Sequence, residues 1–280
     1  MAKLRELTEE LAARKARAAA MGGPERIAKQ HARGKLTARE RLALLFDEGR
    51  YDELGILGKQ PGVDSPADAV VVGFGKIDGR PVGVAAYDFT VLGGSMGPTG
   101  EAKVARLREL CLRHRMPIVW LVDSGGARIG AGGVGGGDAA ASEEHGPSIF
   151  ADTGALFREQ VVMSGVVPQV AAMVGPGAAG TAYIPGLADF VPMVKGTSSM
   201  ALGGRHLVKA AVGEDVTEEE MGGSGVHNRI SGVADRECAD DAECLRLVRD
   251  YLSYFPSRYG DPPPIRPTSD PVDRRGERLY

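Results

Sequence analysis

The chain has 280 residues, of which 43% are hydrophobic and 25% charged, and this suits a globular protein with a substantial core. Its 34 basic and 37 acidic residues give a net charge of −3, so we expect neither a nucleic-acid nor a membrane partner. Three cysteines without a CxxC pair favour neither a disulfide framework nor a zinc ribbon, and no metal site is expected. With no long apolar run and a charged start unlike a signal peptide, the expected location is cytoplasmic.

Two helices are expected in the N-terminal part of the chain. Residues 1–21 favour a helical arm by propensity, and the glycine pair and proline that follow should end it. Thr37 and Glu40 form a capping-box signature for a second helix, which should end at Gly49. Basic residues cluster around its start, and we interpret them either as a solvated basic face or as a phosphate site: Arg33, Lys35, Arg39 and Arg41.

Two strands, a helix and a third strand follow. Residues 69–89 predict a hairpin that turns at Asp78-Gly79, and residues 100–114 predict a helix. The apolar run 117–122 predicts a strand covered on both faces, and the strand–helix–strand order implies a right-handed crossover to a parallel neighbour. Residues 123–126 should form a turn at the end of that strand, which is either a plain tight turn or an oxyanion cradle made of backbone amides.

A second strand of the same kind is predicted later in the chain. Residues 167–174 are apolar, and the glycine-rich stretch 175–180 should lead into a short helix that Pro185 ends or kinks. A helix N-terminus directly after a buried strand has unpaired amides and a positive dipole end. If the two turns lie at neighbouring strand ends, their amides can converge on one oxygen, as is needed to hold a thioester carbonyl while it becomes an enolate.

The rest of the chain predicts shorter elements. The glycine-rich stretch 129–145 is interpreted as a loop that is either disordered or a lid. Residues 261–280 are proline-rich and charged, as is typical of a linker. The other expected elements are helices over about 148–163, 203–212 and 240–255, a helix that begins with the capping box of Thr217 and Glu220, and strands over 188–194 and 230–234.

Several long motifs, in the same order over nearly the whole chain, resemble those of one enzyme family. They are QHARGKLTARERL, YDFTVLGGSMG, PIVWLVDSGGARI, SGVVPQVAAMVGPGAAGTAY, ADFVPMV, GEDVTEEEMGG with His227, and SGVAD. On these motifs the sequence is similar to the N-terminal domain of the biotin-dependent acyl-CoA carboxyltransferases, the beta subunits of propionyl-CoA and related acyl-CoA carboxylases. The resemblance implies an α/β fold of the crotonase (ClpP/crotonase-like) type, a spiral of ββα units. It also implies one domain over residues 1–260 and a linker-like tail over 261–280.

The resemblance also implies roles for individual positions. Two motifs match the family's amide-bearing turns, and we expect their backbone N–H groups to hold the thioester oxygen: Gly125, Gly126 and Ala127 in the first turn, and Gly177, Ala178 and Ala179 in the second. Arg128 is expected either to meet the substrate or to form a structural salt bridge. Lys35 and Arg39 are expected either to contact the phosphates of coenzyme A or to be helix-surface charges.

The cofactor and partners are also implied by the resemblance. In the family, carboxybiotin on a partner protein loses its carboxyl group, and the resulting biotin anion takes the α proton of the acyl-CoA. The implied partners of this chain are a C-terminal carboxyltransferase domain or subunit, biotin carboxylase and the biotin carrier protein, within a homo- or hetero-oligomer. Biotin is not expected to be attached to this chain, and the chain alone is expected to be inactive without the biotin-side half.

Two alternatives stay open beside carboxyl transfer to an acyl-CoA. One is a decarboxylase component acting on malonyl-CoA or a similar thioester, because the same oxyanion site stabilises the same enolate in the reverse direction. The other is a noncatalytic scaffold that binds acyl-CoA. Residues 132–149 appear longer than the family pattern just after the first turn, and this leaves the identity of the acyl group open.

Overall fold

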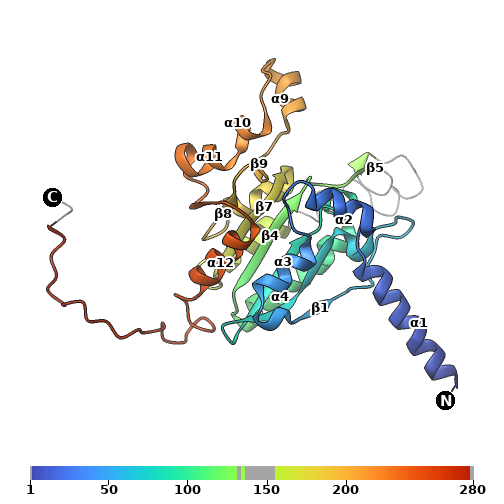
Figure 1. Cartoon of the computed structure of the whole chain (residues 1–280), viewed down its shortest axis with the longest axis horizontal. Helices are drawn as coiled ribbons and strands as arrows, with labels where there is room; N and C mark the ends of the chain where they lie inside the picture. The colour runs from blue at the N-terminus through green and yellow to red at the C-terminus, as the bar shows by residue number, and fades with distance from the viewer. Residues whose placement is uncertain (1, 131–133, 136–154, 278–280) are drawn as a thin grey trace.

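A mixed β-sheet between helical layers forms the body of the protein (Figure 1). The computed structural model describes residues 2–130, 134–135 and 155–277. The strands of the main sheet lie in the order β1-β2-β3-β4-β7-β8-β10, and β9 pairs with β7. Their bounds are β1 Tyr51–Leu54, β2 Val70–Ile77, β3 Arg80–Tyr87, β4 Ile118–Ser124, β7 Gln169–Ala178, β8 Pro192–Val194, β9 Ser199–Ala201 and β10 Arg236–Cys238.

The sheet is antiparallel on one side and parallel on the other, and β2 is the strand that runs opposite to its neighbours. The pairs β1–β2 and β2–β3 are antiparallel, whereas β3–β4, β4–β7, β7–β8 and β8–β10 are parallel. The short strands β5 (Ile129–Gly130) and β6 (Val134–Gly135) form a separate parallel pair. Because β4 and β7 are parallel neighbours, their carboxyl ends lie at the same edge of the sheet.

Helices cover both faces of the sheet. The α-helices are α1 Ala2–Ala19, α2 Gly23–His31, α3 Ala38–Leu45, α4 Pro98–His114, α7 Ala155–Met163, α8 Tyr183–Gly186, α9 Arg205–Val212, α10 Glu218–Gly222, α11 Ser224–Val226 and α12 Asp241–Leu252. Short 3₁₀ segments are η1 Asp47–Gly49, η2 Pro66–Ala69, η3 Leu92–Gly94 and η4 Ala179–Ala182, while η5 His227–Ser231 is a π-helical turn. No helix in the described part of the chain is long and apolar enough to cross a membrane.

Two apolar clusters, one on each face, hold these layers together. Alternate residues of β4 contribute to each, with Val119 and Leu121 in one cluster and Ile118 and Trp120 in the other. Helices α3 and α12 supply side chains to the first cluster, and α4 and α7 supply side chains to the second. All seven residues of β4 are buried, which confirms the prediction of a strand covered on both faces.

Three parts extend away from this body in Figure 1: the N-terminal helix α1, the C-terminal tail, and an arm that contains α9, α10 and α11. We call residues 202–233 the projecting arm. Helix α9 within it has no buried residue. Large apolar side chains of the projecting arm are exposed, namely Leu202, Leu207, Val212, Ile230 and Val233.

Most of the predicted elements are confirmed, and several differ. The capping boxes of Thr37 and Thr217 and the hairpin at Asp78-Gly79 are present. The strand predicted over 230–234 is wrong, because residues 227–231 form the π-helical turn η5 and the nearby strand is β10. Helix α2 and strands β1 and β9 were not predicted. The predicted glycine-rich loop over 129–145, and the beginning of the helix over 148–163, lie mostly outside the described residues, and the domain division at residue 260 stays a prediction.

Candidate functional site

The first predicted turn leaves the carboxyl end of β4. Gly126 has φ +93°, a conformation that favours glycine over residues with a side chain. The Gly125 N–H donates to the Gly93 carbonyl at 2.9 Å, and the Gly126 N–H donates to the Ser124 hydroxyl at 3.1 Å. Both of these amides therefore already have acceptors in this structure.

The amide of Ala127 has a different environment. On either side of it, the Gly126 carbonyl accepts from the Met96 N–H at 2.8 Å and the Arg128 N–H donates to the Met96 carbonyl at 3.0 Å. Since successive N–H groups of an extended segment point in opposite directions, the Ala127 N–H faces away from Met96. Within the described part of the chain it has no loop or turn acceptor, so it is the available donor among the three residues of the first turn.

The second predicted turn begins later than the sequence suggested, because β7 continues as a strand through Ala178. Strand β9 makes this possible by pairing with the extension, for example at Gly177 and Met200. The Ala178 N–H donates to the Thr181 hydroxyl at 3.0 Å, and that hydroxyl donates back to the Ala178 carbonyl at 2.9 Å. Ala179 follows with φ +49° as the first residue of η4, so the chain turns sharply at that position.

The two turns are in direct contact. A Cβ atom placed on Gly126 would lie 2.7 Å from the Ala178 carbonyl oxygen and 3.3 Å from the Ala179 Cβ. The first distance is shorter than real Cβ contacts, so only glycine allows this approach. The two turns therefore lie at neighbouring strand ends, which is the condition for their amides to converge, while the role of those amides in holding a thioester stays a prediction.

Arg128 holds the far end of the first turn through a buried ion pair. Its Nη1 lies 2.5 Å from Asp68 Oδ1 and 2.7 Å from Gln60 Oε1, and its Nε and Nη2 donate to the hydroxyl and carbonyl of Ser95. We call these residues the Arg128 cluster: Gln60, Asp68, Ser95 and Arg128. Of the two roles that the sequence left open for Arg128, the structural salt bridge is present, and contact with substrate stays a prediction.

Asp68 lies in a strained backbone segment. Ala67, Asp68 and Ala69 have φ values of 48°, 46° and 63°, which are uncommon for residues other than glycine. The ammonium group of Lys103 donates to the carbonyls of Ala67 and Val70, at 2.8 and 2.7 Å, on both sides of Asp68. Burial lowers the pKa of Lys103 to about 8. The ion pair and this lysine together stabilise a segment that sequence propensity would not favour.

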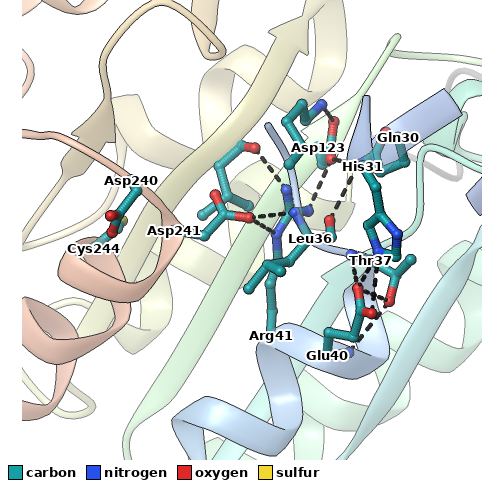
Figure 2. Close-up of polar contacts among 12 residues, drawn as sticks. Gln30, His31, Leu36, Thr37, Glu40, Arg41, Asp123, Asp240, Asp241 and Cys244 are labelled. Carbon is teal, nitrogen blue, oxygen red and sulfur yellow. Dashed lines mark hydrogen bonds and ion pairs between the residues drawn. The ribbon is translucent and has the colours of Figure 1, made fainter. Parts of the chain in front are cut away.

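A second buried cluster holds the near end of the first turn, at Asp123 of β4. Asp123 accepts from Lys35 Nζ at 2.6 Å, from Arg41 Nη1 at 2.8 Å and from Gln30 Nε2 at 2.9 Å. Figure 2 shows the Arg41 side chain reaching from α3 to a point between Asp123 and Asp241. We call these residues the Arg41 cluster: Gln30, Lys35, Arg41, Asp123 and Asp241.

Of the four basic residues near α3, Arg33 is exposed, whereas the other three are paired with carboxylates and do not form a solvated face. Lys35 is 5% exposed and Arg41 is 0% exposed, and both are paired with Asp123. Burial lowers the pKa of Lys35, against the raising effect of the Asp123 carboxylate. Arg39 is half-buried and donates to Glu53 through two nitrogens, at 2.7 and 3.1 Å. Contact of Lys35 and Arg39 with the phosphates of coenzyme A stays a prediction, and the structure gives each cation a carboxylate partner.

Sequence reasoning missed the acidic half of both clusters. Asp68 lies outside the motifs that the sequence analysis singled out, and Asp241 lies far along the chain from the basic cluster at α3, so neither pairing could be read from local spacing. Asp123 had a detectable signal, because a carboxylate that ends a fully apolar strand must find a buried partner. In the described residues no group of three or more His, Cys, Asp or Glu could hold a metal ion.

Comparisons with known proteins agree with this geometry. Residues 29–280 match the model of the carboxyl transferase domain. The chain is 39% identical to methylmalonyl-CoA decarboxylase subunit alpha of Veillonella parvula, covering 100% of this chain and 53% of that protein. It is 39% identical to the mitochondrial propionyl-CoA carboxylase beta chain of Homo sapiens, covering 90% of this chain and 46% of that protein.

A solved structure extends the comparison to three dimensions. Transcarboxylase 12S, crystallised with methylmalonyl-coenzyme A and methylmalonic acid bound and described as a hexamer, superposes with a TM-score of 0.85 at 37% identity. The match covers 95% of this chain and 51% of that one. The chain belongs to the carboxyl transferase domain family and has the crotonase-type α/β fold expected from its motifs. It spans about half the length of the relatives it matches.

Proposed function

We propose that this chain is the acyl-CoA side of a biotin-dependent carboxyltransferase, which moves a carboxyl group between biotin and the α carbon of an acyl-CoA. The observation that carries the proposal is the contact between the turns after β4 and β7, within a chain of this family. The substrate class rests on the relatives, whose names and bound ligand are propionyl-CoA and methylmalonyl-CoA. We therefore propose a short acyl thioester.

The chemical contribution of this chain is stabilisation of an enolate. As the α proton of the thioester leaves, negative charge grows on the carbonyl oxygen, and each amide N–H aimed at that oxygen contributes about 3 kcal/mol. The Ala127 N–H is the donor that we assign first, because the Gly125 and Gly126 amides are engaged within the protein. The donors from the second turn are proposed among Gly177, Ala178 and Ala179, and the Ala178 amide must exchange its bond to Thr181 to take part.

The carboxyl donor requires residues beyond those described. When bound, carboxybiotin would supply the carboxyl group, and the family resemblance assigns its site mainly to a second, homologous domain. The donors in this structure are backbone amides, which suit a thioester oxygen, and we assign none of the described residues to biotin. The further partners that we propose are therefore a C-terminal carboxyltransferase domain or subunit, biotin carboxylase and the biotin carrier protein.

The projecting arm supports the proposal of a partner. Five large apolar side chains are exposed on residues 202–233, from 39% for Val233 to 81% for Ile230. Large apolar side chains exposed on one projecting segment are a feature of interaction surfaces. The cytoplasmic location expected from the sequence stays a prediction.

A second candidate activity is decarboxylation of a malonyl-type thioester. The observation that favours it is the 39% identity to methylmalonyl-CoA decarboxylase subunit alpha, which equals the identity to the carboxylase beta chain. Loss of carbon dioxide from such a substrate produces the same enolate, so the same amides would serve both directions. A noncatalytic acyl-CoA scaffold is the third candidate, and tight binding without turnover in any pairing would favour it.

Calorimetric titration of the purified chain tests the proposal. We expect propionyl-CoA and methylmalonyl-CoA to bind more tightly than free coenzyme A, because free coenzyme A lacks the thioester oxygen that we propose to contact the turns. Equal affinities for acyl-CoA and free coenzyme A would contradict an acyl site in this chain. Release of carbon dioxide from methylmalonyl-CoA is then measured with and without free biotin. Release without biotin would favour the decarboxylase candidate over the carboxyltransferase.

A further inference from the structure

Arg41 contacts three segments that are far apart in the sequence. Its Nη1 donates to Asp123 on β4, its Nη2 donates to the Val174 carbonyl on β7, and its Nε donates to Asp241 at the start of α12, each at 2.8 Å (Figure 2). The side chain is 0% exposed. A guanidinium group has rigid, planar donors, so three simultaneous contacts restrict the positions of all three segments.

Two of these contacts lie directly before the two turns. Asp123 precedes Ser124 and the glycine pair of the first turn, and Val174 precedes the stretch that leads into the second. The pairing of β4 with β7 is irregular at this point, because Val122 opposes Met173 whereas Ser124 opposes Gly177. One residue of β4, Asp123, therefore lies opposite three of β7, residues 174–176, and a bulge of this kind leaves backbone groups without ladder partners. The Val174 carbonyl lies in the bulge and is bonded to Arg41 instead.

Gly175 allows the charged cluster to enter between the strands. A Cβ atom at this position would lie 1.9 Å from Asp123 Oδ1 and 2.7 Å from Lys35 Nζ. The bulge and this glycine thus leave room for a buried carboxylate and two cations between the ends of the two strands. The turns themselves touch at Gly126 and Ala178, so a small shift of either strand end would change the relation between their amides.

We propose that Arg41, acting through Asp123 and Val174, is a positioning residue that sets the spacing between the two amide-bearing turns. The consequence of this inference for binding rests on the proposed function. The effect of Arg41 on the two turns can be measured without substrate, by hydrogen exchange. Any buried, paired arginine can stabilise the fold. Arg41 differs from the other buried arginines because it contacts the ends of both strands.

The test compares Arg41→Lys with Arg108→Lys. Arg108 is also buried, at 1% exposed, and is paired with two carboxylates, Glu101 and Glu159, but it links α4 to α7 instead of the strand ends. Lysine keeps the charge in both variants and loses the fork of donors. Hydrogen exchange of peptides covering residues 122–128 and 172–182 should be faster in Arg41→Lys than in the parent chain and unchanged in Arg108→Lys.

Binding supplies the second readout. In Arg41→Lys the affinity for propionyl-CoA should fall about tenfold while the affinity for free coenzyme A stays within about twofold, because misplaced donors weaken only the thioester contact. Asp241→Asn provides a milder change if Arg41→Lys folds poorly, since it loosens Arg41 without altering either strand, and it should show the same effects at smaller size.

The outcomes separate the two proposals. Faster exchange at both turns in Arg41→Lys supports the positioning role even if the parent chain shows no preference for acyl-CoA, a result that would contradict the proposed function alone. Exchange at the turns that is unchanged in both Arg41→Lys and Asp241→Asn, or equally faster in Arg108→Lys, would overturn the positioning role. A loss of propionyl-CoA affinity of equal size in Arg41→Lys and Arg108→Lys would overturn it too.

Discussion

The first turn is held at its two ends by clusters of opposite design. At the near end a carboxylate on the turn, Asp123, accepts from two buried cations, whereas at the far end a cation on the turn, Arg128, donates to one carboxylate and to three neutral acceptors of Gln60 and Ser95. The near cluster fixes the turn to α2, α3 and α12, and the far cluster fixes it to a strained loop. The near end therefore depends on a network of several charges, whereas the far end depends on one ion pair supported by neutral hydrogen bonds.

Removing the charge of Asp123 should have the largest effect on stability. Asp123→Asn keeps the shape of the side chain but leaves Lys35 and Arg41 with one buried carboxylate between them, and we expect a loss of about 3–5 kcal/mol in the free energy of unfolding. Urea denaturation monitored by circular dichroism measures it. A loss below about 1 kcal/mol would show that water or a shifted lysine compensates the charge, and that the near end does not depend on it.

The glycine pair between the two ends gives a matched comparison. Gly126→Ala should cost about 2 kcal/mol, because its φ is +93° and the new methyl group would meet the Ala178 carbonyl. Gly125→Ala is the control, since a Cβ there would meet only the Gly93 carbonyl, at 3.5 Å. We expect Gly126→Ala alone to weaken the preference for propionyl-CoA over free coenzyme A in calorimetry. Equal effects of the two substitutions would contradict the contact between the turns.

The same Asp-to-Asn change at the far end should cost less. In Asp68→Asn, Arg128 loses its carboxylate partner but keeps its bonds to Gln60 and Ser95, and asparagine tolerates the positive φ of this position, so we expect a loss of about 2 kcal/mol. Urea denaturation of Asp68→Asn beside Asp123→Asn gives the comparison directly. If Asp68→Asn were the more damaging of the two, the far end would be the one that depends on charge.

The smallest expected effect is a pH dependence at the far end. Burial lowers the pKa of Lys103 to about 8, below its value in the unfolded chain, so between pH 8 and about 10.4 the unfolded state binds more protons. The free energy of unfolding should therefore gain about 1 kcal/mol from this group as the pH rises through that window, after allowance for its partial exposure. Lys103→Met should lack this gain when urea denaturation is compared at pH 8 and pH 10. Identical pH profiles would exclude the effect.

Local patterns predicted the turns well and the clusters poorly, for physical reasons. Strand β4, the hairpin and the capping boxes follow from apolar runs and from residues within four positions of one another. The partners of Arg41 lie 82, 133 and 200 positions away, so its burial is decided by the tertiary fold. The misplaced strand at Ile230 has a similar cause. The β-branched residues of this segment favour a strand, yet Ile230 is 81% exposed and lies in the π-helical turn η5.

The sequence separations within the Arg41 cluster also set an order of events during synthesis. At about 5–20 residues per second, Asp241 is made roughly 10–40 s after Arg41. Until then α3 can pack against β2 and β3, but the guanidinium group of Arg41 lacks one of its two carboxylate partners. The docking of α12 cannot begin before that point. Contacts of such long range are typical of slow steps in folding. The turns should therefore acquire their fixed spacing only at the end of folding, so a nascent chain can hold most of its sheet before it can bind a ligand.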